Sequence, residues 1–386
     1  METILFADER AKTRSSVFDR CRSFPSPLMV LDLNAIDDNV EQIRAAFPGV
    51  SLFYALKCNP HPAILERLCS LGVGFEIASQ LELDQVLNAG VPATRLACFH
   101  TIKSPQFLTN LDQAGVRLLA VDCHAELEKI AQFAPNASVL VRLETGTRNS
   151  RHLLNGKFGC PPFVGLDLLA TARHKGLKIA GITMHVGSQC ECLQDWALAT
   201  KTCSDFLRVA SACGMELPVV SLGGGLPVLY TTSIPSLTSI GRSVLSEENL
   251  GHASQTRSLM IEPGRAVVAS AGTLISTVIG VAERGEERWA YLDAGVYHGL
   301  IEKLQIAGGF VLPIDCEHPD RAVQTYRLAG PTCDSLDVFP GTYELPELHI
   351  GDRIAFRMAG AYSSSISTEF NGFPGPVTVL KSDLPG

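Results

Sequence analysis

Residues 53–59 read Phe-Tyr-Ala-Leu-Lys-Cys-Asn, a short apolar run that stops at a single lysine, Lys57. The run predicts a buried strand, and a lysine at the mouth of such a strand is unusual unless its amine is used. Burial disfavours the charged form of a lysine, lowers its pKa and leaves a neutral amine that can attack a carbonyl group. The alternative is a lysine that ends an edge strand and points into water. This heptapeptide alone favours that alternative, and the rest of the chain reverses the preference.

Apolar runs of the same kind recur along the chain, and each is followed by a segment with helical periodicity. Eight runs are found, at residues 51–57, 73–79, 96–101, 118–122, 138–144, 179–187, 219–223 and 259–263. The helical segments include residues 62–71, 81–89, 105–114, 125–133, 164–174 and 196–212. Eight alternating units predict an α/β fold with a (β/α)8 barrel, and their number disfavours the alternative, a doubly wound open sheet.

The hydrophobic pattern changes after residue 265, where helical periodicity gives way to alternating apolar and polar runs separated by Gly and Pro. These runs lie at residues 272–281, 288–293, 322–328, 353–358 and 377–380. They predict a C-terminal antiparallel β domain. We therefore expect a polar lead-in at residues 1–27, which can join the β domain, a barrel at residues 28–265 and the β domain at residues 266–386.

Composition excludes several classes of protein. The 386 residues carry a net charge of −8 that is spread along the chain, so no surface for nucleic acid or a membrane is expected. No apolar run is as long as a membrane span, and the charged residues 1–22 do not resemble a signal peptide. The 12 cysteines have irregular spacings, which predict buried thiols in a reducing cytoplasm and no metal site.

Polar residues gather at the C-terminal limits of the predicted strands. They are Lys57, Glu76 with Ser79, Thr101, Asp122, Arg142, His185, Gly223 to Gly225, and Glu262. In a barrel these limits converge on one rim, where active sites are found. One such residue is commonly structural, but a series in register at successive strand ends predicts a site.

The residue types at this rim suit one cofactor. Gly223-Gly224-Gly225 can bring bare backbone N–H groups close to a phosphate, and Arg265 can add charge to it. Glu262 can pair with a protonated pyridine nitrogen and so make the ring an electron sink. His185 can stack on the ring, and Ser188 offers a further phosphate donor. Together with a Schiff-base lysine, these residues predict a pyridoxal phosphate (PLP) site.

The chain resembles the fold-type III PLP decarboxylases, the family of ornithine, lysine, arginine and diaminopimelate decarboxylases, and is most similar to the ornithine decarboxylase branch. The resemblance runs in order from about residue 28 to 380. It is carried by 53–59, Gly-Phe-Glu76-Ile-Ala-Ser, His185-Val-Gly-Ser188, Gly223 to Gly225, Glu262-Pro-Gly-Arg265, Gly330-Pro-Thr-Cys333-Asp334-Ser and Gly360-Ala-Tyr362. It implies an alanine racemase-like barrel, and the Gly-Pro-Thr-Cys-Asp stretch separates this branch from alanine racemases themselves and, less sharply, from diaminopimelate decarboxylases.

The resemblance implies roles for the matching residues. Lys57 would hold PLP as a Schiff base, Glu262 would bind the pyridine nitrogen, and Cys333 would return a proton to the carbon that loses CO2. The remaining cofactor contacts would be Ser188, Gly223, Gly224, Gly225, Arg265 and Tyr362 around the phosphate, His185 behind the ring, and Arg142, Glu76 and Glu82 on its far side.

The resemblance also implies a homodimer with shared active sites. In such enzymes the residues that match Cys333 and Asp334 come from the partner subunit. Lys157 and Asp337 match a pair that bridges subunits in that branch.

One departure concerns the substrate side chain. The branch places a carboxylate shortly after a segment like Asp293-Ala-Gly-Val-Tyr297, and here that position falls at Gln305 or Ile306, with Glu302 as the nearby acid. Asp334 remains to hold a distal ammonium group. The predicted substrate-binding residues are therefore Asp334, Cys333, Gln305, Ile306 and Phe370.

The function predicted from these features is PLP-dependent α-decarboxylation of an amino acid, ornithine or a related basic one, to an amine and CO2 in polyamine-type metabolism. A decarboxylase of a non-basic or modified amino acid, as in siderophore pathways, is the alternative that the departure leaves open. A non-catalytic protein resembling the antizyme inhibitors is disfavoured because every cofactor position matches. A racemase is disfavoured by Cys333.

Overall fold

The computed structural model describes residues 3–4, 17–152, 156–305 and 311–385. It divides into two compact units, which we describe separately. The barrel unit contains residues 37–228 and 234–267, and the β unit contains residues 1–36, 229–233 and 268–386.

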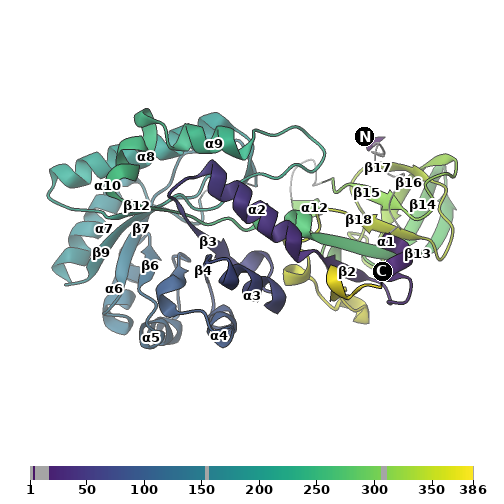
Figure 1. Cartoon of the computed structure of the whole chain (residues 1–386), viewed down its shortest axis with the longest axis horizontal. Helices are drawn as coiled ribbons and strands as arrows, with labels where there is room; N and C mark the ends of the chain where they lie inside the picture. Colours follow the sequence, from purple (N-terminus) through teal and green to yellow (C-terminus); the bar gives the residue numbers. More distant parts are fainter. Residues whose placement is uncertain (1–2, 5–16, 153–155, 306–310, 386) are drawn as a thin grey trace. The chain divides into compact units, whose positions relative to one another are not determined.

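Eight of the described strands close into a parallel barrel, as predicted (Figure 1). They are β3 (Ser51–Ala55), β4 (Gly74–Glu76), β5 (Leu96–Cys98), β6 (Leu118–Val121), β7 (Ser138–Arg142), β9 (Lys178–Thr183), β11 (Val219–Ser221) and β12 (Ser258–Ile261). The ring closes where Met260 of β12 pairs with Ser51 of β3. Each of these strands ends before the matching apolar run does, so the last residues of the runs follow the strands at the rim.

Helices follow the barrel strands along the chain. They are α3 (Pro62–Ser70), α4 (Gln80–Asn88), α5 (Pro105–Ala114), α6 (His124–Phe133), α7 (Pro162–His174), α8 (Leu193–Ala212), α9 (Leu237–Val244), α10 (His252–Thr256) and α11 (Arg265–Val268); α2 (Leu33–Ala46) precedes β3. Local signals set their limits. In α5, Ser104 accepts the Phe107 N–H, Pro105 occupies the first turn, and Gly115 ends the helix with φ of +85°.

Side chains from several strands fill the barrel interior. A buried cluster joins Ala97, Phe99, Ala120, Leu140, Ala180 and Met260. The alanines of β5, β6 and β9 leave room for the larger side chains of β7 and β12. The interior is therefore packed rather than open, and chemistry is confined to the rim.

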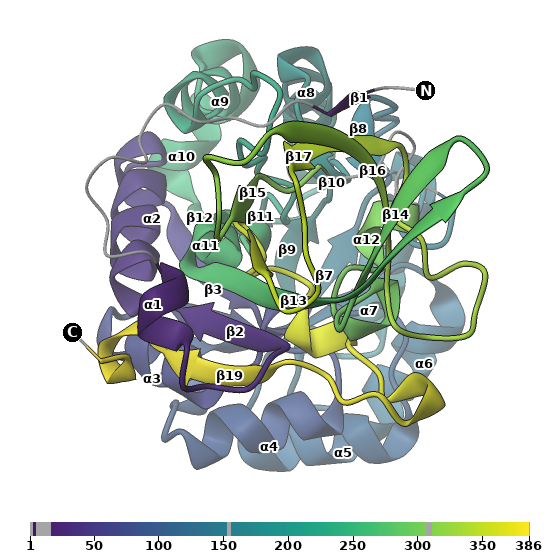
Figure 2. The same cartoon turned by 90° about the vertical axis from the view of Figure 1, so that its right-hand side faces the viewer.

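The β unit is built around the long strand β13 (Gly272–Arg284). β13 pairs antiparallel with β14 (Glu287–Leu292), β18 (Arg353–Phe356) and β2 (Leu28–Leu31). β19 (Val377–Leu380) runs parallel beside β2 (Figure 2). The other described strands of this sheet are β1 (Thr3–Ile4), β15 (Ile314–Cys316), β16 (Val323–Ala329) and β17 (Thr342–Pro346). A mostly antiparallel sheet is thus confirmed, with parallel pairing of β14 to β16, β1 to β17 and β19 to β2.

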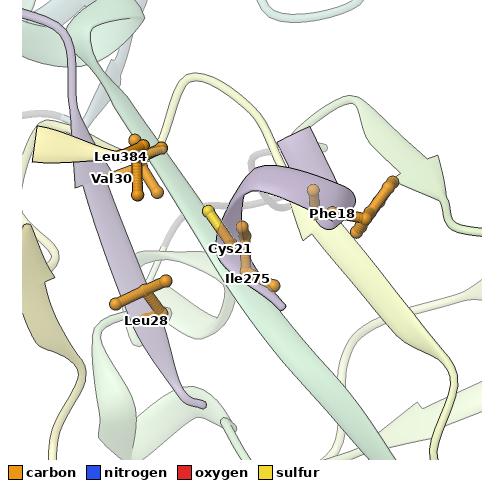
Figure 3. Close-up of a cluster of buried hydrophobic side chains, with 7 residues drawn as sticks. Phe18, Cys21, Leu28, Val30, Ile275 and Leu384 are labelled. Atoms are coloured by element: carbon orange, nitrogen blue, oxygen red, sulfur yellow. The ribbon is translucent and has the colours of Figure 1, made fainter. Parts of the chain in front are cut away.

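Distant parts of the chain share one core in the β unit. Phe18 and Cys21 of α1 (Val17–Cys21) pack with Ile275 of β13 and with Leu384 near the C-terminal end (Figure 3). Leu28, Val30 and Ala355 complete the cluster. In the described part of the chain, no helix combines the length and apolar character needed to cross a membrane.

The barrel unit buries an ion network beside α6. Lys103 Nζ and the Glu126 carboxylate are both fully buried and lie 3.1 Å apart. Lys103 Nζ also donates to the carbonyl oxygens of His100 and Ala120, each at 2.8 Å. Lys129, whose side chain is 31 % exposed, reaches the other Glu126 oxygen at 2.5 Å. The same carboxylate therefore has one buried and one partly exposed cationic partner.

Removing the buried partner is expected to cost far more stability than removing the exposed one. Lys103→Met should lower the free energy of unfolding by about 3 kcal/mol, because it leaves buried polar groups without their partner. Lys129→Met, the matched control, should lower it by less than about 1 kcal/mol. Urea unfolding of the full chain, followed by circular dichroism, measures both. Equal losses in the two variants would contradict this account.

Candidate active site

Lys57 stands just beyond the end of a barrel strand. β3 ends at Ala55, and the chain continues in a 3-10 turn over Leu56–Cys58. Leu56 and Cys58 are buried, whereas the Lys57 side chain is exposed. The burial expected for this lysine is therefore wrong: the strand stops two residues earlier, so Lys57 lies outside the packed layer, at the barrel mouth. This position leaves its amine accessible to a ligand.

Buried carboxylates lie at the ends of β4 and β12, the two barrel strands that flank β3. Glu76 ends β4 and is 5 % exposed, and Glu262 follows β12 and is 9 % exposed. Burial, followed by the charge of Glu76, raises the pKa of Glu262 to about 7, against the opposing effects of Ser221, Arg142 and Lys57. Glu262 is thus poised between its two protonation states, and a nearby cation would favour the ionised one.

Glu82 adds a third carboxylate to this rim. It lies in the first turn of α4 and accepts the Ala78 N–H at 2.6 Å. Burial raises its pKa, and the charge of Glu76 acts in the same direction, while Lys57 opposes it. Glu76, Glu82 and Lys57 therefore interact electrostatically, as their predicted grouping at one rim requires.

The cationic side of the rim is formed by Arg142, which ends β7. Burial lowers its pKa, and the charges of Glu262, Glu76 and Asp122 oppose that effect. Arg142 also lies over the Phe158 ring, 5.4 Å from its centroid. The Arg142 guanidinium therefore interacts electrostatically with carboxylates at the ends of several strands.

His185 follows β9 and is held as a neutral imidazole. Desolvation, followed by the charges of Arg142 and Lys57, lowers its pKa well below the usual value. Its Nδ1 accepts the Gly187 N–H at 2.9 Å, so in the neutral ring the proton lies on Nε2. A neutral, fixed ring is suited to stacking on a flat ligand.

The backbone at Gly223 and Gly225 lies so close to neighbouring backbone atoms that no residue with a side chain would fit. Gly223 and Gly225 have φ of +66° and +106°. A Cβ on them would lie 2.0 Å from the Met184 carbonyl oxygen and 2.3 Å from that of Gly187. Glycine is therefore required at both positions, and the backbone forms a bare surface at the end of β11.

Arg265 lies close to this surface. It opens α11, is 4 % exposed, and its Nη2 lies 3.4 Å from Ser188 Oγ. Ser188 belongs to β10 (Ser188–Cys190), which pairs with β8 (Ser150–His152). The structure thus brings together two predicted phosphate ligands from distant parts of the sequence.

Sequence reasoning missed two hydroxyl groups at this rim. Thr183 Oγ1 lies 3.4 Å from Glu262 Oε1, and Ser221 Oγ donates to the same oxygen. Both residues end barrel strands, β9 and β11. Their positions at strand ends are a signal in the sequence, but small hydroxyl residues are so common in strands that they do not stand out within the apolar runs.

In the β unit, Tyr297 links predicted substrate-binding residues. Its hydroxyl donates to Asp334 Oδ2 at 2.5 Å, and its ring lies 4.9 Å from that of Phe370, centroid to centroid. Cys333 is exposed, and its N–H donates to Asn371 Oδ1 at 3.0 Å. Cys333, Asp334 and Phe370 thus belong to one cluster, which also contains Tyr297.

Asp337 holds two loops of that cluster together. It is 2 % exposed and accepts the N–H groups of Val296, at 2.8 Å, and Thr332, at 3.0 Å, and the Thr332 hydroxyl at 2.7 Å. Lys157, in the barrel unit, lies 4.9 Å from the Phe158 ring centroid. A bridge between Lys157 and Asp337 of two subunits stays a prediction.

Two further predicted residues, Tyr362 and Gln305, lie in the β unit. Tyr362 is half-buried, with φ of +50°. Gln305 ends the short helix α12 (Glu302–Gln305), and Ile306 lies outside the described residues. The role of the segment from 302 to 310 in substrate choice therefore stays a prediction.

The raised pKa of Glu262 gives a pH test. A carboxyl group whose folded pKa lies above its ordinary value stabilises the fold when protonated, and that contribution is lost as pH rises from about 4.5 through about 7. In cofactor-free protein, Glu262→Gln should therefore gain stability over the wild type as pH rises through this window. Glu128→Gln, at an exposed carboxylate, is the control. Urea unfolding at several pH values measures the difference, and a flat difference for Glu262→Gln would rule the account out.

The donor set of the barrel unit fits PLP. Arg265, Ser188 and the glycine surface suit a phosphate, Glu262 suits a ring nitrogen, and Lys57 offers an accessible amine. These groups lie at one rim, where the register of the strands brings their carboxyl ends together.

Comparisons with known proteins agree with this fit. The family model for the pyridoxal binding domain of pyridoxal-dependent decarboxylases matches residues 33–269. A lysine/ornithine decarboxylase of Selenomonas ruminantium is 32 % identical over 367 residues, 94 % of this chain and 92 % of that protein. Antizyme inhibitor 2 of Xenopus laevis is 31 % identical over 358 residues, 89 % of this chain and 78 % of that protein.

A solved structure agrees over nearly the whole chain. The lysine/ornithine decarboxylase of Vibrio vulnificus, complexed with cadaverine, superposes with a TM-score of 0.87 at 32 % identity, covering 95 % of this chain and 98 % of that one. The resemblance found in the sequence is thereby confirmed. The chain belongs to the pyridoxal-dependent decarboxylases, and its cofactor is pyridoxal phosphate.

Proposed function

We propose that this enzyme decarboxylates a basic amino acid of the ornithine and lysine class, releasing a diamine and CO2. The observation that carries the proposal is the set of hydrogen bonds that keeps the Asp334 carboxyl group ionised. The Leu336 N–H and the Tyr297 hydroxyl donate to its carboxylate and lower its pKa. Asp334 is therefore ionised at neutral pH and suited to a cationic side chain. The relatives named above as lysine/ornithine decarboxylases support the same class.

The barrel unit would hold the cofactor. Lys57 would form the covalent bond, and Arg265 and Ser188 would bind the phosphate. The Gly223 N–H already donates to Ser221 Oγ at 3.2 Å, so we expect the amides of Gly224 and Gly225 to face the phosphate. Bound PLP supplies an electron sink for the bond that breaks at the substrate α-carbon.

Glu262 would hold a proton on the pyridine nitrogen. Its pKa of about 7 is set by burial and by Glu76, and a pyridinium partner would lower it. The carboxylate would then be ionised at neutral pH. His185, neutral and fixed through Nδ1, would lie against the ring.

Cys333 would donate the proton that the substrate α-carbon takes up after CO2 has left. Its thiol lies on an exposed loop that Asn371 anchors through the backbone, so the group is accessible. We propose that Cys333 and Asp334 serve the barrel of a partner subunit, which makes the active unit a homodimer. A cytoplasmic place in polyamine-type metabolism accords with this substrate class.

Two alternatives have specific observations behind them. The segment after Tyr297 has Gln305 and Ile306 where the branch has a carboxylate, which would suit a non-basic substrate. The antizyme inhibitor among the relatives suggests a binding role. The retained Lys57, Glu262 and Arg265 at one rim favour the enzyme over the binding role.

Substrate choice is tested by a decarboxylation panel. Purified enzyme with PLP should release CO2 from ornithine or lysine in preference to arginine, diaminopimelate, diaminobutyrate and aromatic amino acids. Asp334→Asn should reduce kcat/KM for the basic substrates at least about tenfold, because a neutral amide cannot pair with a distal ammonium. If an uncharged or acidic substrate is preferred, and Ile306→Asp then gains ornithine activity, the missing carboxylate sets specificity and our proposal is wrong.

Shared active sites are tested by mixing two inactive variants. Lys57→Ala lacks the covalent anchor, and Cys333→Ala lacks the proton donor. If each site combines Lys57 of one subunit with Cys333 of the other, heterodimers regain one intact site, about a quarter of wild-type activity after random exchange. Tagged subunits confirm that exchange has occurred. Exchange without recovery of activity would reject the sharing of sites.

A further inference from the structure

One serine hydroxyl contacts two parts of the proposed cofactor site. Ser221 ends β11, which lies between β9 and β12 in the barrel, and its side chain is completely buried. Its Oγ lies within hydrogen-bonding distance of Glu262 Oε1 and 3.2 Å from the backbone nitrogen of Gly223. The Glu262 N–H in turn donates to the Gly223 carbonyl oxygen at 2.8 Å.

The direction of these hydrogen bonds follows from the atoms involved. The Gly223 nitrogen can only donate, so Ser221 Oγ accepts from it. An ionised carboxylate can only accept, so the Ser221 proton points to Glu262 Oε1. Thr183, which pairs with Ser221 in strand register, approaches the same oxygen at the longer distance of 3.4 Å. Both hydroxyls thus engage Oε1, which leaves Oε2 as the oxygen that can turn to a ring nitrogen.

We propose that Ser221 is a positioning residue that locks the Glu262 carboxylate in its ring-facing orientation and ties it to the glycine surface that receives the phosphate. The proposal rests on the roles proposed above for Glu262 and the glycine run. One hydroxyl would then set the relative positions of the groups that hold the two ends of the cofactor. Neither Ser221 nor Thr183 is among the site residues that the sequence predicts.

The same hydroxyl supports the ionised state of Glu262. The charged groups that act on Glu262 from other strands of the barrel are Glu76 at the end of β4, Arg142 at the end of β7 and Lys57 after β3. Burial and Glu76 raise the pKa, while the Ser221 hydrogen bond is the first of the effects that lower it. Without that bond, the carboxyl group would stay protonated to a higher pH and could not pair as a carboxylate with a pyridinium N–H.

The test measures PLP affinity of cofactor-free protein across pH, rather than activity. Wild-type affinity should rise with pH through the ionisation of Glu262. Ser221→Ala should bind PLP about tenfold more weakly at pH 7, because a hydrogen bond to a charged group is lost. The midpoint of its pH dependence should lie higher, so that affinity recovers in alkaline solution. Absorbance or fluorescence titration with PLP gives both quantities.

Matched variants separate positioning from simple loss of packing. Thr183→Val removes the longer contact without changing shape and should shift the midpoint less than Ser221→Ala. Ser221→Thr keeps a hydroxyl and Ser221→Cys keeps a weaker donor, so they should give a near-normal and an intermediate midpoint. These two variants also decide the matter if thermal melting shows that Ser221→Ala does not fold.

The outcomes distinguish this inference from the function on which it rests. If Glu262→Gln binds PLP as the wild type does across pH, the proposed role of Glu262 fails. If Glu262→Gln binds weakly but Ser221→Ala is unchanged, or is weakened equally at every pH, Ser221 does not position the carboxylate. A raised midpoint in Ser221→Ala that Ser221→Thr restores supports the proposal.

Discussion

A carboxylate buried at the end of β12 is the constraint on which the barrel rim depends. Removing an ionised group from water is costly unless other groups compensate, and Glu262 is only 9 % exposed. The compensation comes from different strands: the Ser221 hydroxyl, the charge of Arg142 and the charge of Lys57. Burial and, after it, the charge of Glu76 oppose them and raise the pKa of Glu262 to about 7. Because the two protonation states of Glu262 are therefore nearly equal in free energy at neutral pH, the binding of a cationic ring would be enough to ionise the carboxyl group.

The closed parallel barrel makes this balance possible. Different strands contribute Glu76, Arg142, Thr183 and Ser221 at their carboxyl ends, so residues far apart in sequence meet at one rim. The packed interior below the rim keeps these strand ends fixed. Preorganised charges of this kind need no rearrangement when a ligand binds, which is the general advantage of building a site on strands rather than on long loops.

The sequence predicts the barrel strands and the grouping of Glu76, Arg142 and Glu262, because apolar runs mark the strands and a polar residue marks each end. It misplaces the burial of Lys57, since an apolar run does not reveal where hydrogen bonding stops and a 3-10 turn begins. It also misses Ser221, because its effect depends on the neighbouring strand that supplies Glu262. Short strands such as β15 lack enough residues to show alternation. The end of β3, the contact of Ser221 and the short strand β15 depend on neighbours in the folded structure rather than on the hydrophobic pattern of the local sequence.

In the β unit, hydrogen-bond donors likewise stabilise an ionised carboxylate, that of Asp334. Its two oxygens accept from different donors, the Leu336 N–H at Oδ1 and the Tyr297 hydroxyl at Oδ2. Each carboxylate oxygen has two lone pairs, so these bonds favour the ionised form and still leave capacity for an ammonium group. Asp337 fixes the loops that bring Tyr297 and Asp334 together. In the proposed function, this single ionised and oriented carboxylate would select a cationic side chain, and the acid expected near Gln305 or Ile306 would not be needed.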